Sequence, residues 1–75
     1  MNNIRRKELS KAKNMIDQAQ MIIQNVKFDE EMAFDNLSEG LQQTMRGESM
    51  ENNIDVLDDI SDAIDNILEQ FDEIE

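Results

Sequence analysis

The chain of 75 residues contains no Cys, His, Pro, Trp or Tyr and only two Gly. Without Cys it can form neither a disulfide nor a thiolate metal site. Without His it lacks the commonest general base and the commonest metal ligand. Both glycines, Gly40 and Gly47, fall in one short region, so two long segments without helix breakers lie on either side of it. This distribution is typical of a helical hairpin.

Long apolar runs are also missing. No segment approaches the roughly 18 apolar residues that a membrane-spanning helix needs. The charged N-terminus, residues 1–13, is not followed by the apolar core of a secretory signal. We therefore expect a cytoplasmic protein that does not bind membranes.

The charge is acidic and unevenly distributed, with a formal net value of -11. Residues 1–28 carry six basic and two acidic side chains, a net charge of +4, whereas residues 29–75 carry one basic and sixteen acidic side chains, a net charge of −15. A chain this acidic repels nucleic acid and anionic membranes, so we expect no direct binding to either.

The first long segment has apolar residues in heptad spacing, with successive steps of 3, 4, 3, 4 and 3. They are Leu9, Ala12, Ile16, Ala19, Ile23 and Val26. Met15 and Ile22 widen this apolar face beyond the width that a two-stranded coiled coil uses. The pattern predicts a helix from about residue 4 to about residue 34.

The last segment repeats the same steps of 3, 4, 3, 4 and 3. Its apolar residues are Leu57, Ile60, Ile64, Ile67, Phe71 and Ile74. Asn53 occupies a preceding position of this pattern, where it either fixes the helix register or lies at a hydrated helix start. The pattern predicts a second long helix over residues 50–74.

Residues 35–49 form the predicted connector. Ser38 is expected to cap a short helix from Glu39 to Met45, and Gly47 to supply the left-handed residue that ends it. Ser49 is then expected to cap the last helix. The connector is longer than a helix turn requires, so we expect it to pack over the end of the bundle and bury Phe34, Leu37, Leu41 and Met45; the alternative is a loop that binds a partner. The candidate connector residues are Phe34, Asn36, Leu37, Leu41, Arg46 and Gly47.

Two paired helices bury only one side of each other, and their wide apolar faces remain partly hydrated. The expected solution is an antiparallel four-helix bundle formed by a homodimer. The side chains predicted to form the core or the dimer interface are Leu9, Ile16, Ile23, Val26, Leu57, Ile60, Ile64, Ile67 and Phe71.

The acidic residues are poorly suited to metal binding or catalysis. An EF-hand loop needs a central Gly and a non-helical turn, whereas these carboxylates recur at helical spacing. The serines have no evident base beside them, and nothing indicates a pocket that would separate the pKa values of two carboxylates. We expect no enzymatic activity, no metal site and no cofactor.

One row of carboxylates instead indicates a binding surface. On the last helix these residues step by 3 or 4 along one face, with neighbours about 5–6 Å apart. They are Asp55, Asp58, Asp62, Asp65, Glu69 and Asp72. Such a row can mimic the phosphates of nucleic acid and occupy a basic groove, or it can be the solvated face of a soluble oligomer.

The connector also carries a family resemblance. The stretch EEMAFDNLSEGLQQTMRGESME, followed by an Ile- and Asp-rich helix, resembles a group of short acidic proteins from phages, prophages and mobile elements of Firmicutes. The matching residues are Glu31, Ala33, Phe34, Asp35, Asn36, Leu37, Glu39, Leu41, Gln42, Arg46, Gly47, Glu48 and Met50. Ser38 stands where that group usually has Pro, and both are favoured at a helix start. The resemblance implies an accessory protein of a mobile element in a bacterial host, and no particular activity.

The functional hypothesis is therefore a non-enzymatic protein that binds a basic host protein through its acidic face, as a nucleic-acid mimic or inhibitor. One alternative is a structural module that only oligomerises. Another is a sponge that holds a small anionic ligand between two protomers, which would require Arg5, Arg6 or Arg46 to face a shared cavity.

Overall fold

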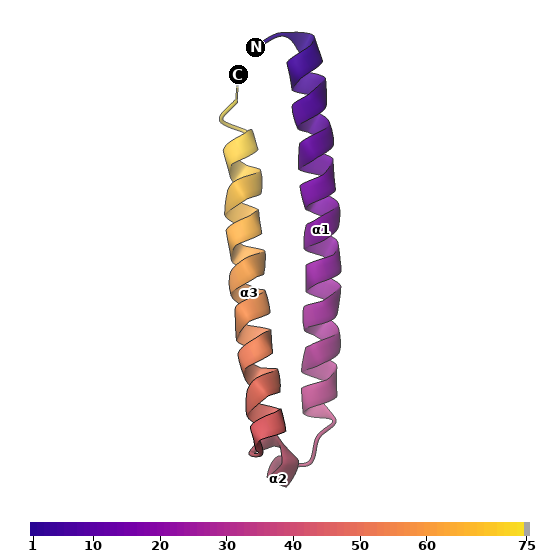
Figure 1. The fold of residues 1–75 in the computed structure, drawn as a ribbon, viewed down its shortest axis with the longest axis vertical. Coiled ribbons are helices and arrows are strands. Elements are labelled where there is room, and N and C mark those ends of the chain that lie inside the picture. The colour runs from indigo at the N-terminus through magenta and orange to yellow at the C-terminus, as the bar shows by residue number, and fades with distance from the viewer. Residues whose placement is uncertain (75) are drawn as a thin grey trace.

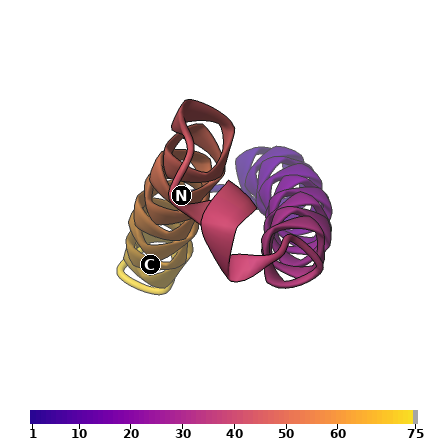
Figure 2. The same cartoon turned by 90° about the horizontal axis from the view of Figure 1, so that it is seen from below.

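The computed structural model describes residues 1–74, which form three helices. Helix α1 spans Asn3–Asp35, α2 spans Glu39–Gln42 and α3 spans Met45–Phe71. The two long helices run antiparallel, and α2 joins them at one end, while both termini lie at the other (Figure 1). Seen from that closed end, α2 crosses the space between the ends of α1 and α3 (Figure 2). The predicted all-helical hairpin of long, short and long helices is confirmed.

Each helix begins at a polar side chain that caps it. The side chain of Asn2 accepts a hydrogen bond from the backbone N–H of Arg5, at 2.9 Å, at the start of α1. Ser38 accepts one from the N–H of Leu41, so the predicted cap of α2 is confirmed. These bonds satisfy backbone donors that the first turn leaves without a partner. Helix α2 ends at Gln42, three residues before the predicted end.

Helix α3 begins five residues earlier than predicted. Its cap is Thr44, whose hydroxyl accepts a hydrogen bond from the N–H of Gly47, and the expected cap Ser49 lies inside the helix. Gly47 was predicted to be left-handed, and this is wrong, because no glycine among residues 1–74 has a positive φ. The cap at Thr44 lets the helix form before Gly47, so the glycine is part of its first turn.

Gly47 instead permits a close backbone contact. A Cβ at this position would overlap the backbone carbonyl group of Gln42. The side chain of Gln42 reaches the other way, and its Nε2 donates hydrogen bonds to the carbonyl oxygens of Phe34 and Leu37, at 3.1 and 3.2 Å. Gln42 therefore links the end of α1 to the beginning of α3, and the turn depends on the missing side chain of Gly47.

Replacing Gly47 by Ala should therefore destabilise the protein by about 1–3 kcal/mol, the usual cost of forcing atoms into an occupied site. The matched control is Gly40→Ala, because a Cβ at Gly40 would meet no atom within 4 Å. That change should be neutral or stabilising by up to about 1 kcal/mol, since it reduces the freedom of the unfolded chain. Urea unfolding followed by circular dichroism measures both, and equal midpoints for the two variants would contradict the contact.

The two long helices pack through a heptad series that shares every second position with the predicted one and is shifted by one residue at the positions between. In α1 the positions expected for Ala19 and Val26 are taken by Gln20 and Lys27. The half-buried or buried side chains of this series in α1 are Leu9, Lys13, Ile16, Gln20, Ile23, Lys27, Glu30 and Phe34. The corresponding side chains in α3 are Met50, Ile54, Leu57, Ser61, Ile64, Leu68 and Phe71.

Polar contacts explain this rotation of the helices. Gln20 is 6% exposed, and its Nε2 donates to the carbonyl oxygen of Ser61 at 2.9 Å and to Asp65 Oδ1 at 2.7 Å. Lys27 Nζ lies 2.7 Å from Asp58 Oδ1. Hydrogen bonds that involve a charged group are stronger than neutral ones, so they favour this orientation over one that buries Ala19 and Val26.

The hairpin alone buries very little apolar surface. Met50 is the one buried hydrophobic residue among those that the structure describes. The radius of gyration is 17.3 Å, whereas a compact domain of this length would have about 11 Å. The chain forms a rod with principal extents of 59 × 15 × 13 Å, a single layer of two helices without a second layer to close a core.

Candidate interaction surfaces

One side of the hairpin is a continuous apolar surface. Relative to Gln20 in α1 and Ser61 in α3, exposed apolar residues lie at the same offsets of −1, +2 and +6. Both helices are right-handed and antiparallel, so equal offsets fall on the same side of the hairpin. We define the apolar face as Met15, Ala19, Ile22 and Val26 of α1 with Val56, Ile60, Ala63 and Ile67 of α3.

The single hairpin exposes more surface than a compact monomer of its mass would, and part of that surface is the apolar face. A folded monomer of 8.7 kDa would expose about 4,700 Å², whereas the chain exposes 5946 Å². Met15 and Ile22 are 68% and 62% exposed. The difference, about 1,200 Å², exceeds the roughly 800 Å² that each partner contributes to a standard protein interface.

The residues predicted to form the core or the dimer interface divide into two groups. Six of them are half-buried in the hairpin: Leu9, Ile16, Ile23, Leu57, Ile64 and Phe71. The other three, Val26, Ile60 and Ile67, are exposed on the apolar face, so they are not part of the core of the single hairpin, and their place in a dimer interface stays a prediction. They lie beside the helix contact rather than in it, because Gln20, Lys27 and Ser61 occupy those positions.

The predicted row of carboxylates lies on the opposite side from the apolar face. We call Asp55, Asp58, Asp62, Asp65, Glu69 and Asp72 the acidic row, and all six are exposed. Three of them contact α1: Asp58 pairs with Lys27, Asp65 accepts from Gln20, and Asp72 Oδ1 lies 3.7 Å from Lys13 Nζ.

These contacts give the acidic row two parts with different roles. Asp58, Asp65 and Asp72 hold α3 against α1, and they follow the heptad steps of the helix interface. Asp55, Asp62 and Glu69 are turned further outward, each seven residues from the next. The outward carboxylates are the part of the row best placed to meet a partner.

Among the basic residues of the part of the chain that the structure describes, Lys27 forms ion pairs with two carboxylates. Its Nζ contacts Asp58 and also lies 3.6 Å from Glu31 Oε1. The hydrogen bond that Lys27 donates to Asp58, together with the charges of both carboxylates, raises the pKa of Lys27. Because its pKa is raised, the lysine is fully charged at neutral pH, and its contribution to the pairing is lost as the pH rises through the alkaline value of the lysine. Lys27 therefore keeps its charge bound inside the acidic region at every physiological pH.

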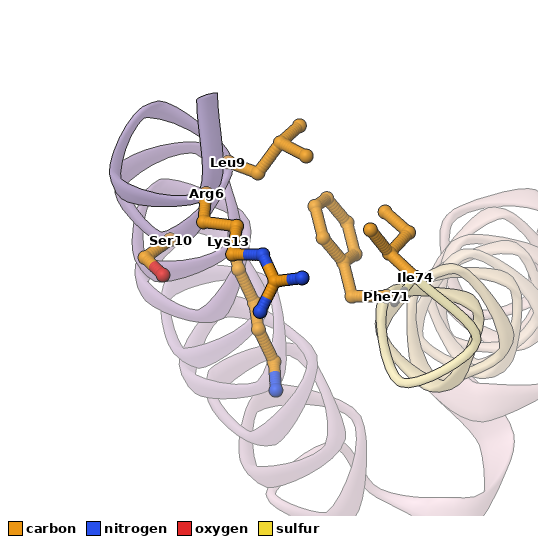
Figure 3. A pocket seen from close by; sticks show the side chains of 6 residues that line it. All are labelled: Arg6, Leu9, Ser10, Lys13, Phe71 and Ile74. Atoms are coloured by element: carbon orange, nitrogen blue, oxygen red, sulfur yellow. The ribbon is translucent and has the colours of Figure 1, made fainter. Parts of the chain in front are cut away.

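A cavity of about 270 Å³ opens between the free ends of the long helices. Leu9 of α1 faces Phe71 of α3 and Ile74 across it, while Arg6 and Lys13 lie along its rim beside Ser10 (Figure 3). The Nε of Arg6 donates to the carbonyl oxygen of Met1, and Lys13 pairs with Asp72. Both cations of this cavity are thus engaged with the chain itself, and Arg5 and Arg46 do not line it.

The predicted connector residues act mostly through the backbone. Asn36 ends α1: its N–H donates to the carbonyl oxygen of Met32, and the N–H of Leu37 donates to the carbonyl oxygen of Phe34. Phe34 and Leu37 are half-buried, as expected for residues that close the end of the hairpin. Asn36 and Arg46 are exposed. Leu41 and Met45 are exposed as well, so the prediction that these two apolar side chains are buried over the end is wrong. Helix α2 is too short to cover both.

Sequence reasoning missed the residues that set the helix contact. Gln20, Ser61 and Gln42 are polar, and a search for apolar periodicity passes over them. The available signal was the excess width of the two apolar faces. A helix with two adjacent apolar stripes needs two partners, and only one of the two stripes can face the other arm of a hairpin.

Comparison of the chain with protein-family models, with curated proteins and with solved structures gave no match. Within residues 1–74, no three acidic side chains come close enough together to hold a metal ion. No helix in the same part of the chain is long and apolar enough to cross a membrane. The structure thus defines the class of protein, an all-helical hairpin with one apolar and one acidic side. These two sides are its candidate interaction surfaces.

Proposed function

We propose that this chain is a non-enzymatic, protein-binding accessory protein of a bacterial phage or mobile element. It acts as a homodimeric four-helix bundle whose outward acidic rows occupy the basic surface of a nucleic-acid-handling or defence protein. The observation that supports this most is the separation of the two surfaces. The apolar face and the acidic row lie on opposite sides of one thin hairpin, so the first can be buried while the second stays free.

In the proposed dimer, the apolar faces of two hairpins pack against each other. This adds the second layer that the rod lacks and buries Met15, Ile22, Val26, Ile60 and Ile67. The two hairpins can pair in two ways, so that α1 of one copy lies beside either α1 or α3 of the other copy. Charge favours the one in which α1 of one copy lies beside α3 of the other, because residues 1–28 are basic and α3 facing α3 would bring like charges together.

The acidic rows then lie on the two outer sides of the bundle. Each row presents Asp55, Asp62 and Glu69, and none of these three forms an ion pair with a basic residue among residues 1–74. Clustered charge of one sign attracts a partner of the opposite sign and raises the rate of association. Basic grooves that bind nucleic acid are surfaces of this kind.

Charge reversal tests this binding surface. Replacing Asp55, Asp62 and Glu69 together by Lys should abolish the capture of host proteins by the tagged chain at physiological salt, because it changes the charge of each row by six units. The control replaces Asp29, Asp35 and Glu39 by Lys, an equal change of charge at exposed positions outside the row. Quantitative mass spectrometry of the captured proteins gives the readout. Equal loss of capture in both variants would show that net charge alone, and not the acidic row, causes the effect. Retention of capture in both variants would show that the acidic row is not the binding surface.

The second candidate is an oligomerisation module, which the extent of the apolar face favours. In that case the acidic row only keeps the bundle soluble. The two candidates differ in one respect: reversal of Asp55, Asp62 and Glu69 leaves the activity of a simple oligomerisation module intact.

A further inference from the structure

The acidic side of the hairpin also carries exposed apolar side chains on α1. Met21, Phe28 and Met32 are 64%, 60% and 48% exposed. Met21 follows Gln20 by one residue and Phe28 follows it by eight, so both lie on the flank of α1 opposite to Ala19, Ile22 and Val26. They are therefore outside the apolar face and would stay uncovered in the proposed dimer.

The acidic residues of α3 stand level with these three side chains. The contacts of Gln20 with Asp65 and of Lys27 with Asp58 fix the pairing of the two antiparallel helices. In that register Met21 lies across from Asp62, Phe28 from Asp55 and Met32 from Glu51. The two sets have the same spacing, 7 and then 4 residues, on facing flanks of the hairpin. We call these six residues the mixed surface.

The mixed surface has one apolar and one acidic margin, and it extends over three helical turns. Residues 21 and 32 are about 17 Å apart along α1 at 1.5 Å per residue. The cation nearest the centre, Lys27, is neutralised by Asp58 and Glu31, so it does not oppose a basic ligand. Met side chains adapt to varied partners, and Phe contributes a large apolar contact.

We propose that the mixed surface docks a basic amphipathic helix of a partner protein. The apolar stripe of that helix would contact Met21, Phe28 and Met32, and its Lys or Arg residues would pair with Glu51, Asp55 and Asp62. Amphipathic helices are commonly recognised by an apolar surface with complementary charge beside it. A partner recognised by its charge alone would not need the three exposed apolar side chains. This inference rests on the proposed function, since it specifies the kind of partner that the acidic side accepts.

The experiment uses the full chain and three fluorescent 18-residue peptides, followed by fluorescence anisotropy. The first peptide has Leu on one helical face and Lys on the other. The second has the same composition with Leu and Lys no longer segregated, and the third has Glu in place of Lys. The proposal expects the first peptide to bind at least about tenfold more tightly than the second, because only segregated Leu residues can reach the apolar margin. The third should not bind.

Two variants locate the binding. Met21→Ser with Phe28→Ser should weaken the first peptide about tenfold while leaving the second unchanged. The control is Met45→Ser, an exposed apolar residue outside the mixed surface, which should have no effect. Circular dichroism and molar mass must match the unaltered protein, as expected for exposed positions.

The proposal is overturned if the first two peptides bind equally, if neither binds, or if the Met21 and Phe28 changes leave affinity unaltered. Equal binding that is lost when Asp55, Asp62 and Glu69 become Lys would leave the proposed function intact and show that charge alone is recognised. Failure of both that triple reversal and the peptide experiment would overturn the proposed function as well.

Discussion

We expect Ile60→Asp to dissociate the proposed dimer into monomers at micromolar concentration. Ile60 lies at the centre of the apolar face and is 40% exposed in the single hairpin. Burying a fully exposed side chain of this size contributes about 1.5–3 kcal/mol. Dimerisation can bury only the exposed 40% of Ile60, which is about 0.6–1.2 kcal/mol in each of the two copies. Losing both contributions, about 1.2–2.4 kcal/mol, weakens dimerisation by a factor of roughly 10 to 60. The desolvation of two carboxylates at the interface adds to this loss.

The matched control for Ile60→Asp is Met21→Asp. Met21 is also an exposed apolar residue on a long helix, but it lies on the acidic side. The molar mass from sedimentation equilibrium should fall for the first variant and stay unchanged for the second. The melting temperature of the unaltered protein should rise with its concentration, because association stabilises the folded state. A dimer that tolerates Asp at position 60 would place the interface elsewhere.

The second large effect is a gain of stability from Gln20→Leu. Gln20 is buried between the helices, and its Oε1 has no hydrogen-bond partner. An unpaired buried polar atom costs about 1–3 kcal/mol, and a Leu at this position adds apolar contacts with the opposite helix. The free energy of unfolding should therefore increase by about 1–3 kcal/mol in urea titrations at fixed protein concentration.

The same substitution should reduce structural specificity. Buried polar residues fix the register and partner number of helical bundles at a cost in stability. Without Gln20, the hydrogen bonds to Ser61 and Asp65 disappear, and α1 can rotate toward its wider apolar stripe. We expect a mixture of oligomers in sedimentation velocity. The paired change Gln20→Asn retains a polar amide and should restore a single species, and a single species for Gln20→Leu would contradict this role.

The sequence was sufficient to predict the hairpin because the features that define it involve residues close together in the chain. The heptad steps in residues 9–26 and 57–74 and the absence of Pro define two long helices, and the cluster of small and polar residues between them defines the turn. Ser38 was identified as a helix cap from its residue type alone. These features depend on neighbours in the chain, which a sequence shows directly.

The orientation of the helices could not be predicted in the same way. Apolar periodicity favoured Ala19 and Val26 as contact positions, whereas the structure uses Gln20 and Lys27. The deciding contacts are hydrogen bonds between residues 31 to 45 positions apart. Polar residues count against burial in any hydrophobic pattern, so such contacts become visible only when both partners are placed in space.

Gly47 shows the same limit in the connector. A glycine before a long helix is commonly a left-handed helix end, and that reading placed the start of the last helix too late. The residue is instead needed for the contact with the backbone of Gln42. The sequence identified the position as special, but it could not show whether the backbone angle or the missing side chain was the reason.

We propose that one hairpin is an incomplete fold and that a second copy covers its apolar face. Sedimentation equilibrium of the full, untagged chain at several concentrations measures this assembly. We expect a molar mass of about 17 kDa, twice the 8.7 kDa of the chain, with reversible dissociation on dilution. A fully helical protein that stays at 8.7 kDa up to high micromolar concentration would contradict it.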